Sequence, residues 1–142
     1  MDTLSLYDLA EQENIEVIRF SMRQNGSMSI MGENSLCYIG MDPSVLDGSI
    51  QERVHLAHEL GHCITGSFYN RYATADNRQR HENRADKWAV KQLIPVEKLD
   101  EAIAAGHTEI WDLAEHFGVT EDFIRKAVCY YVHGNVATQL YF

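Results

Sequence analysis

Residues 54–62 read VHLAHELGH, and this stretch places His58 and His62 four positions apart. A Ser-x-x-Glu pattern at residues 49–52 is typical of a helix N-terminus, and apolar residues recur at helical spacing after it. The pattern predicts a helix over about 50–65. On such a helix the two histidines share one face, with their Cβ atoms about 5–6 Å apart.

This pair of histidines predicts a metal site. From that spacing both imidazoles can reach one zinc ion at about 2.0–2.1 Å. Glu59 lies beside the same face, where its carboxylate could contact a water molecule at the metal and act as the general base of a hydrolysis. We therefore expect Zn²⁺ as the cofactor, His58 and His62 as ligands and Glu59 as the catalytic residue.

A catalytic zinc needs a third protein ligand and keeps a fourth position open. A second helical pattern runs from His81 to Ile94 and contains Glu82 and Asp86, which are four residues apart and share a face. One of these carboxylates could bind the metal while the other accepts a hydrogen bond from a ligating imidazole. Spacing alone leaves Glu82, Asp86, His81 and Asp76 open as the third ligand.

The two helices together resemble the ImmA/IrrE family of zinc metallopeptidases. The HELGH sequence at 58–62 is followed by ENRADKWAVKQLIP at 82–95, and both match that family's helix motifs. The resemblance implies Glu82 as the third ligand and Asp86 as the carboxylate that orients an imidazole. It extends more loosely to a strand at 36–40 and to the segment 113–119. His55 departs from the family pattern, in which a small hydroxyl residue is common.

The resemblance also implies a function. Members of the ImmA/IrrE family are zinc metalloendopeptidases of the cytoplasm. Many of them cleave a helix-turn-helix repressor that controls a prophage, a mobile element or a stress response. We therefore expect a protein substrate, most simply a DNA-binding repressor. The substrate itself does not follow from the motif.

Composition bounds the fold and the compartment. The 142 residues are 45% apolar, which suits one domain spanning 1–142 that needs no metal or disulfide to complete its core. No apolar run is long enough to cross a bilayer, and the N-terminus has no basic flank, so we expect neither a membrane segment nor a signal peptide. Three cysteines leave at least one unpaired and form no CxxC, which predicts no disulfide framework, no thiolate zinc site and a reducing compartment, the cytoplasm.

The order of the patterns predicts an α+β fold. A short helix over 3–13 precedes three strands, and short helices fill a C-terminal subdomain over about 96–142. The predicted strands are Ile15–Met22, Ser27–Met31 and Leu36–Met41. Asn25-Gly26 is typical of a tight hairpin, so we expect a small antiparallel three-stranded sheet packed on the two metal-binding helices. The third strand is expected to offer a free edge to an extended substrate segment.

Two other functions fit parts of the sequence. The formal net charge of -9 suits a non-hydrolytic antirepressor or antitoxin-like module that binds a basic DNA-binding protein. Residues 109–131 show a pattern typical of a helix-turn-helix. However, the second helix of this pattern begins with two acidic residues and offers only Arg125 and Lys126 as basic residues. We therefore expect no direct nucleic-acid binding, and expect this segment and Cys63 and Cys129 to pack in the core.

Peptide hydrolysis also requires a donor that stabilises the oxyanion. The sequence leaves this role open among five residues: Tyr69, Tyr72, Arg71, His81 and Tyr130.

Overall fold

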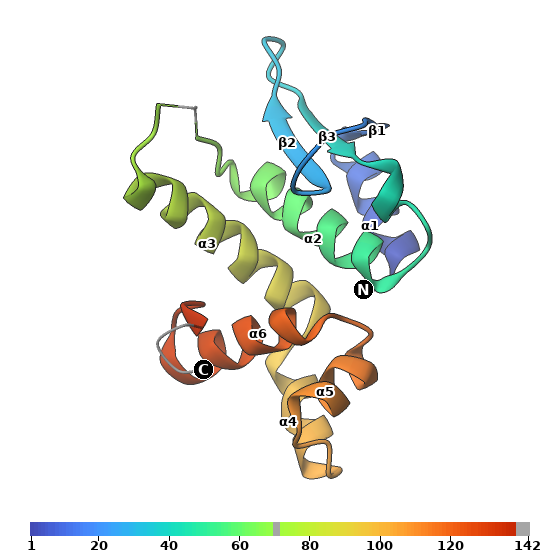
Figure 1. The fold of residues 1–142 in the computed structure, drawn as a ribbon, viewed down its shortest axis with the longest axis vertical. Helices are drawn as coiled ribbons and strands as arrows, with labels where there is room; N and C mark the ends of the chain where they lie inside the picture. The colour runs from blue at the N-terminus through green and yellow to red at the C-terminus, as the bar shows by residue number, and fades with distance from the viewer. Residues whose placement is uncertain (70–71, 139–142) are drawn as a thin grey trace.

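A computed structural model describes residues 1–69 and 72–138 of the chain, and its class is α+β (Figure 1). The N-terminal half contains α1 (Thr3–Gln12), β1 (Glu16–Arg19), β2 (Ser27–Met31), β3 (Cys37–Met41), the 3₁₀ turn η1 (Pro43–Val45) and α2 (Ile50–Thr65). The second half contains α3 (Ala75–Leu93), α4 (Val96–Ala104), α5 (Ile110–Phe117) and α6 (Glu121–His133). The predicted fold class and the helical C-terminal part are confirmed.

The sheet is mixed, so the prediction of a fully antiparallel sheet is wrong. Its order is β1-β3-β2, with β1 parallel to β3 and β2 antiparallel to it. Burial explains the order. Ile39 and Met41 of β3 are fully buried, whereas β1 and β2 are largely exposed. The most buried strand takes the middle position, where both of its edges are paired. The expectation that this third strand offers a free edge is therefore also wrong.

The Asn25-Gly26 pair turns the chain without joining neighbouring strands. Both residues have positive φ, 74° and 77°, as a type I′ turn requires. However, the carbonyl of Gly26 accepts a hydrogen bond from the backbone N–H of Asp42 at 2.8 Å, so the turn leads β2 onto β3. The predicted hairpin between the first two strands is absent, and β1 ends at Arg19, before the predicted Met22.

Helices α2 and α3 lie side by side, with the sheet and α1 on one side of α2 (Figure 1). The side chains of Leu56 and Leu60 on α2 are fully buried in the hydrophobic core. Helix α3 begins at Ala75, earlier than the predicted His81, because the Thr74 hydroxyl caps it by accepting from the N–H of Asn77. Its exposed, polar first turns carry no apolar period that would reveal a helix in the sequence.

Helix α6 packs against α3, and α5 packs against α6. Phe123 and Ile124 of α6 are buried in the same core, and the Tyr131 hydroxyl donates to the carbonyl of Ile94 at 2.7 Å. Cys129 is buried, as predicted, and its thiol is free. Within the described ranges, no helix has the length and apolarity required to cross a membrane.

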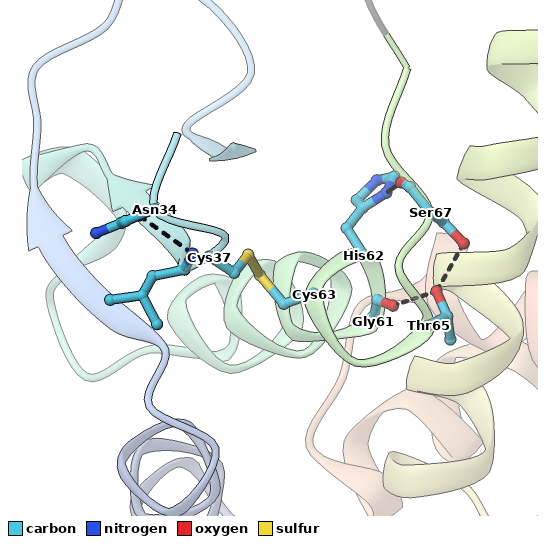
Figure 2. The surroundings of a disulfide bond; sticks show 8 residues. Asn34, Cys37, Gly61, His62, Cys63, Thr65 and Ser67 are labelled. Atoms are coloured by element: carbon cyan, nitrogen blue, oxygen red, sulfur yellow. Dashed lines mark hydrogen bonds between the residues drawn. A yellow bond between two sulfur atoms is a disulfide. The ribbon is translucent and has the colours of Figure 1, made fainter. Parts of the chain in front are cut away.

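A disulfide joins Cys37 at the start of β3 to Cys63 near the end of α2 (Figure 2). The prediction that the cysteines form no disulfide is therefore wrong. The two Cα atoms lie 5.9 Å apart although the residues are 26 positions apart in sequence. Only the packing of the sheet on α2 brings them together, which the spacing of the cysteines does not reveal. Cys63 directly follows His62, so the disulfide lies next to one of the predicted metal ligands.

Candidate active site and metal centre

A cleft of about 850 Å³ opens between β2, α2, α3 and α6. Its lining includes the five predicted site residues His58, Glu59, His62, Glu82 and Asp86. Strand β2 contributes residues 27–30 and the C-terminal helix contributes Phe123 and Lys126. The structure thus brings together residues from four separate elements.

His58, His62 and Glu82 form the only group of three or more ligating side chains that converge closely enough for a metal within the described ranges. Nε2 of His58 lies 2.8 Å from Oε2 of Glu82, and Nε2 of His62 lies 3.2 Å from Oε1. Two imidazole nitrogens and a carboxylate are a donor set that zinc accepts in catalytic sites. This group could bind a metal ion, with two ligands from α2 and one from α3.

The other ring nitrogen of each imidazole, Nδ1, is hydrogen-bonded to an oxygen atom. Nδ1 of His58 lies 2.8 Å from Oδ1 of Asp86, and Nδ1 of His62 hydrogen-bonds the backbone carbonyl of Ser67. An oxygen partner at Nδ1 fixes the tautomer and the ring orientation that leave Nε2 free for a metal. The other oxygen of Asp86 lies 3.3 Å from Nζ of Lys126 on α6. Asp86 therefore connects His58 to the C-terminal helix.

Burial and hydrogen bonds shift the pKa values of the two histidines and of Glu82. Burial lowers the pKa of His58, but hydrogen bonds to Asp86 and Glu82 outweigh it and raise that pKa to about 10. Burial also lowers the pKa of His62, but the hydrogen bonds to Glu82 and to the Ser67 carbonyl outweigh burial, so the pKa is raised. Burial would raise the pKa of Glu82, yet its contacts with the two histidines hold it far below its usual range. The pocket thus stabilises protons where a cation would bind.

Glu59 lies beside this group and is anchored by a hydroxyl. The Ser27 hydroxyl donates to Oε2 of Glu59 at 2.7 Å, and its oxygen lies 2.7 Å from Nδ1 of His55. Ser27 and Glu59 are both buried. One carboxylate oxygen of Glu59 is therefore already engaged on the side of β2.

The structure separates the alternatives that spacing left open. Asp86 contacts His58 and lies outside the converging group, and neither His81 nor Asp76 belongs to that group or lines the cleft. Of the predicted oxyanion donors, Tyr69 lines the cleft and its hydroxyl donates to Oε1 of Glu82 at 2.9 Å. Tyr72, His81 and Tyr130 are not among the lining residues, and Arg71 lies outside the described residues.

Three contributors to the site are not predicted from the sequence: Ser27, Ser67 and Lys126. Ser67 acts through its backbone carbonyl, which no residue type signals. The sequence marks Lys126 only as a base that could face DNA, and Ser27 only as part of a strand. Ser67 lies just beyond the end of α2, whereas Ser27 and Lys126 reach the site from β2 and α6, whose placement depends on tertiary packing.

The comparison with protein families agrees with this geometry. The M78 peptidase family model, described as the IrrE N-terminal-like domain, matches residues 39–128. The match covers more than half of the chain, so this protein belongs to that peptidase family, a metallopeptidase class. No curated protein matches the chain.

Proposed function

We propose that the chain is a zinc-dependent endopeptidase. The observation that carries this proposal is a buried carboxylate, Glu59, beside three convergent metal-ligating groups in an open cleft. Zinc would supply a Lewis acid that polarises a carbonyl and acidifies water. His58, His62 and Glu82 would hold it, and Asp86 would fix the ring of His58.

Glu59 is the proton carrier of the reaction we propose. Its carboxylate would accept a proton from the attacking water and deliver it to the leaving amine nitrogen as the peptide bond breaks. Tyr69 lines the cleft, and its hydroxyl, once released from Glu82, would donate to the developing oxyanion. We expect Tyr69→Phe to lower kcat by about 10²-fold or more, with zinc content unchanged.

The edge that the substrate would use belongs to β2. Among the described residues this strand pairs only with β3, and its residues 27–30 line the cleft. An extended substrate segment could add to that edge, as peptides do to exposed strands. The net charge of -9 would favour a basic segment, such as one from a DNA-binding repressor.

Cleavage in a cell extract tests the function and finds the substrate in the same experiment. The zinc-loaded wild type and zinc-loaded Glu59→Gln are each incubated with the extract, and newly formed protein N-termini are identified. We expect new termini with the wild type alone, with repressors among the cleaved proteins. Equal cleavage by both proteins would refute the role of Glu59. Repressor inhibition that survives Glu59→Gln would instead support a non-hydrolytic antirepressor.

We place this activity in the cytoplasm, where a repressor would be met. Disulfides are rare there, so Cys37 and Cys63 should be reduced in the cell. Thiol alkylation in acid-quenched cells tests the compartment. Modification of Cys37 and Cys63 without added reductant supports the cytoplasm, whereas modification only after reduction indicates an oxidising compartment.

A further inference from the structure

Ser27 lies between the side chains of two residues of α2, His55 and Glu59. Its Oγ atom lies 2.7 Å from Oε2 of Glu59 and 2.7 Å from Nδ1 of His55. Ser27 is the first residue of β2, whereas both of its partners belong to α2. A hydroxyl from the sheet is thus inserted between two side chains one helical turn apart.

The directions of these hydrogen bonds follow from the number of available protons. A serine hydroxyl has one hydrogen, and here it is donated to Glu59. The bond to His55 therefore requires the imidazole to donate from Nδ1. Burial lowers the pKa of His55, more than the nearby Glu59 raises it, which favours a neutral ring. A neutral ring that donates from Nδ1 carries its single proton there.

The ring of His55 is seated against the turn that precedes β2. A Cβ atom on Gly26 would lie 3.1 Å from Cε1 and 3.3 Å from Nε2 of His55. Gly26 also has a φ of +77°, which disfavours any residue with a side chain. A side chain at residue 26 would therefore crowd the ring, and the close approach of the turn limits the movement of His55.

We propose that Ser27 and His55 are positioning residues that hold the carboxylate of Glu59 in one orientation. Oε2 is engaged by Ser27, so Oε1 is the oxygen left to accept a proton from water. His55 acts through Ser27, because its Nδ1–H occupies the acceptor side of the hydroxyl and directs the hydroxyl hydrogen toward Glu59. Its catalytic consequence rests on the proposed peptidase function, but the hydrogen-bond arrangement does not.

The first test is independent of activity. Nitrogen-15 NMR of the histidine side chains reports which ring nitrogen of His55 carries the proton. We expect the Nδ1–H form in the wild type, with and without zinc, and a shift toward Nε2–H in Ser27→Ala. Ser27→Thr, which keeps the hydroxyl, should restore the Nδ1–H form. An Nε2–H ring in the wild type, or an unchanged ring in Ser27→Ala, would overturn the proposal.

The second test uses a cleaved substrate identified from the cell extract. We expect Ser27→Ala to lower kcat by about 10- to 100-fold, the effect of a small misplacement of a catalytic group, with KM and zinc content unchanged. His55→Leu should have the same effect. His55→Asn should recover part of kcat, because its amide can donate in place of Nδ1–H. Ser44→Ala, the same change at a site away from the cleft, is the control.

The two proposals fail in different ways. If the zinc-loaded wild type cleaves nothing, the peptidase function is refuted, and the NMR result still decides whether Ser27 and His55 hold Glu59. If the wild type cleaves and Ser27→Ala retains full kcat, the positioning role is refuted and the peptidase function stands. A fall in kcat accompanied by loss of zinc would show that Ser27 maintains the metal site, which also contradicts the proposal.

Discussion

The backbone carbonyl oxygen of Ala85 lies 2.5 Å from the point that a Cβ atom on Gly61 would occupy. No real side chain tolerates that distance, so α2 and α3 approach this closely only because residue 61 is glycine. Gly61 precedes His62, and Ala85 precedes Asp86. The contact therefore sets the separation between the histidines of α2 and the carboxylates of α3.

Gly61→Ala tests this relationship. The added methyl group must push the two helices apart, because its neighbour is backbone that cannot rotate away. We expect a loss of stability of about 1–3 kcal/mol, typical of an overpacked contact, together with weaker zinc binding. Urea unfolding and zinc titration measure the two effects. Ile64→Ala, an exposed change on the same helix, should affect neither; normal zinc affinity in Gly61→Ala would contradict the inference.

Asp86→Ala should weaken zinc binding although Asp86 is not a predicted ligand. Loss of a carboxylate behind a metal-binding imidazole typically costs 10- to 100-fold in affinity. Lys126→Met should cause a smaller decrease, because it leaves Asp86 present but removes its second partner. Competition with a zinc chelator measures both, with Lys98→Met as an exposed control. Equal affinity of Asp86→Ala and the wild type would remove Asp86 from the site.

Zinc binding to the metal-free protein should release protons at neutral pH. With its pKa raised to about 10, His58 is protonated at pH 7 and must lose that proton to bind a metal. The apparent affinity should therefore fall by about tenfold for each pH unit of acidification and each proton released. Calorimetry in two buffers with different ionisation enthalpies counts the protons. Identical heats in both buffers would show that the histidines are neutral before binding.

Removal of the Cys37–Cys63 disulfide should destabilise the fold. A cross-link between residues 26 positions apart contributes about 3.5 kcal/mol by restricting the unfolded chain. Urea unfolding of the oxidised wild type should therefore show a higher midpoint than that of the Cys37→Ser, Cys63→Ser double variant. Reductant should lower the wild-type midpoint and leave the double variant unchanged. A reductant effect of the same size on both proteins would rule out this bridge as its cause.

Helix α2 is predictable because the signals that define it are local in the sequence. The range 50–65 follows from a cap, a helical period and a terminal glycine, and the structure places α2 at the same residues. The positions of His58, Glu59 and His62 on it follow from helical geometry. The approach of Glu82 to the histidines does not follow from spacing, which leaves four residues open. The family resemblance, based on residues that flank Glu82, selects it.

The predictions that were wrong concern contacts between segments that are far apart in the sequence. Strand pairing depends on which strand is buried in the final packing, so the parallel alignment of β1 with β3 leaves no mark within β1. The disulfide likewise depends on where β3 lies against α2. Ser27 illustrates the same limit at the site, because a small polar residue in a strand does not reveal that a carboxylate from α2 lies opposite it.

The ion pair between Lys126 and Asp86 bears on how short a working version of this chain can be. Among the described residues, the group that could hold a metal ion is complete by Glu82, yet the carboxylate that contacts Nδ1 of His58 has its cationic partner on α6. The hydroxyl that holds Glu59 comes from residue 27, upstream of the family match at 39–128. The smallest fragment that contains the whole arrangement therefore runs from Ser27 to Lys126, and a fragment trimmed to α2 and α3 would lack the hydroxyl of Ser27 and the ammonium group of Lys126.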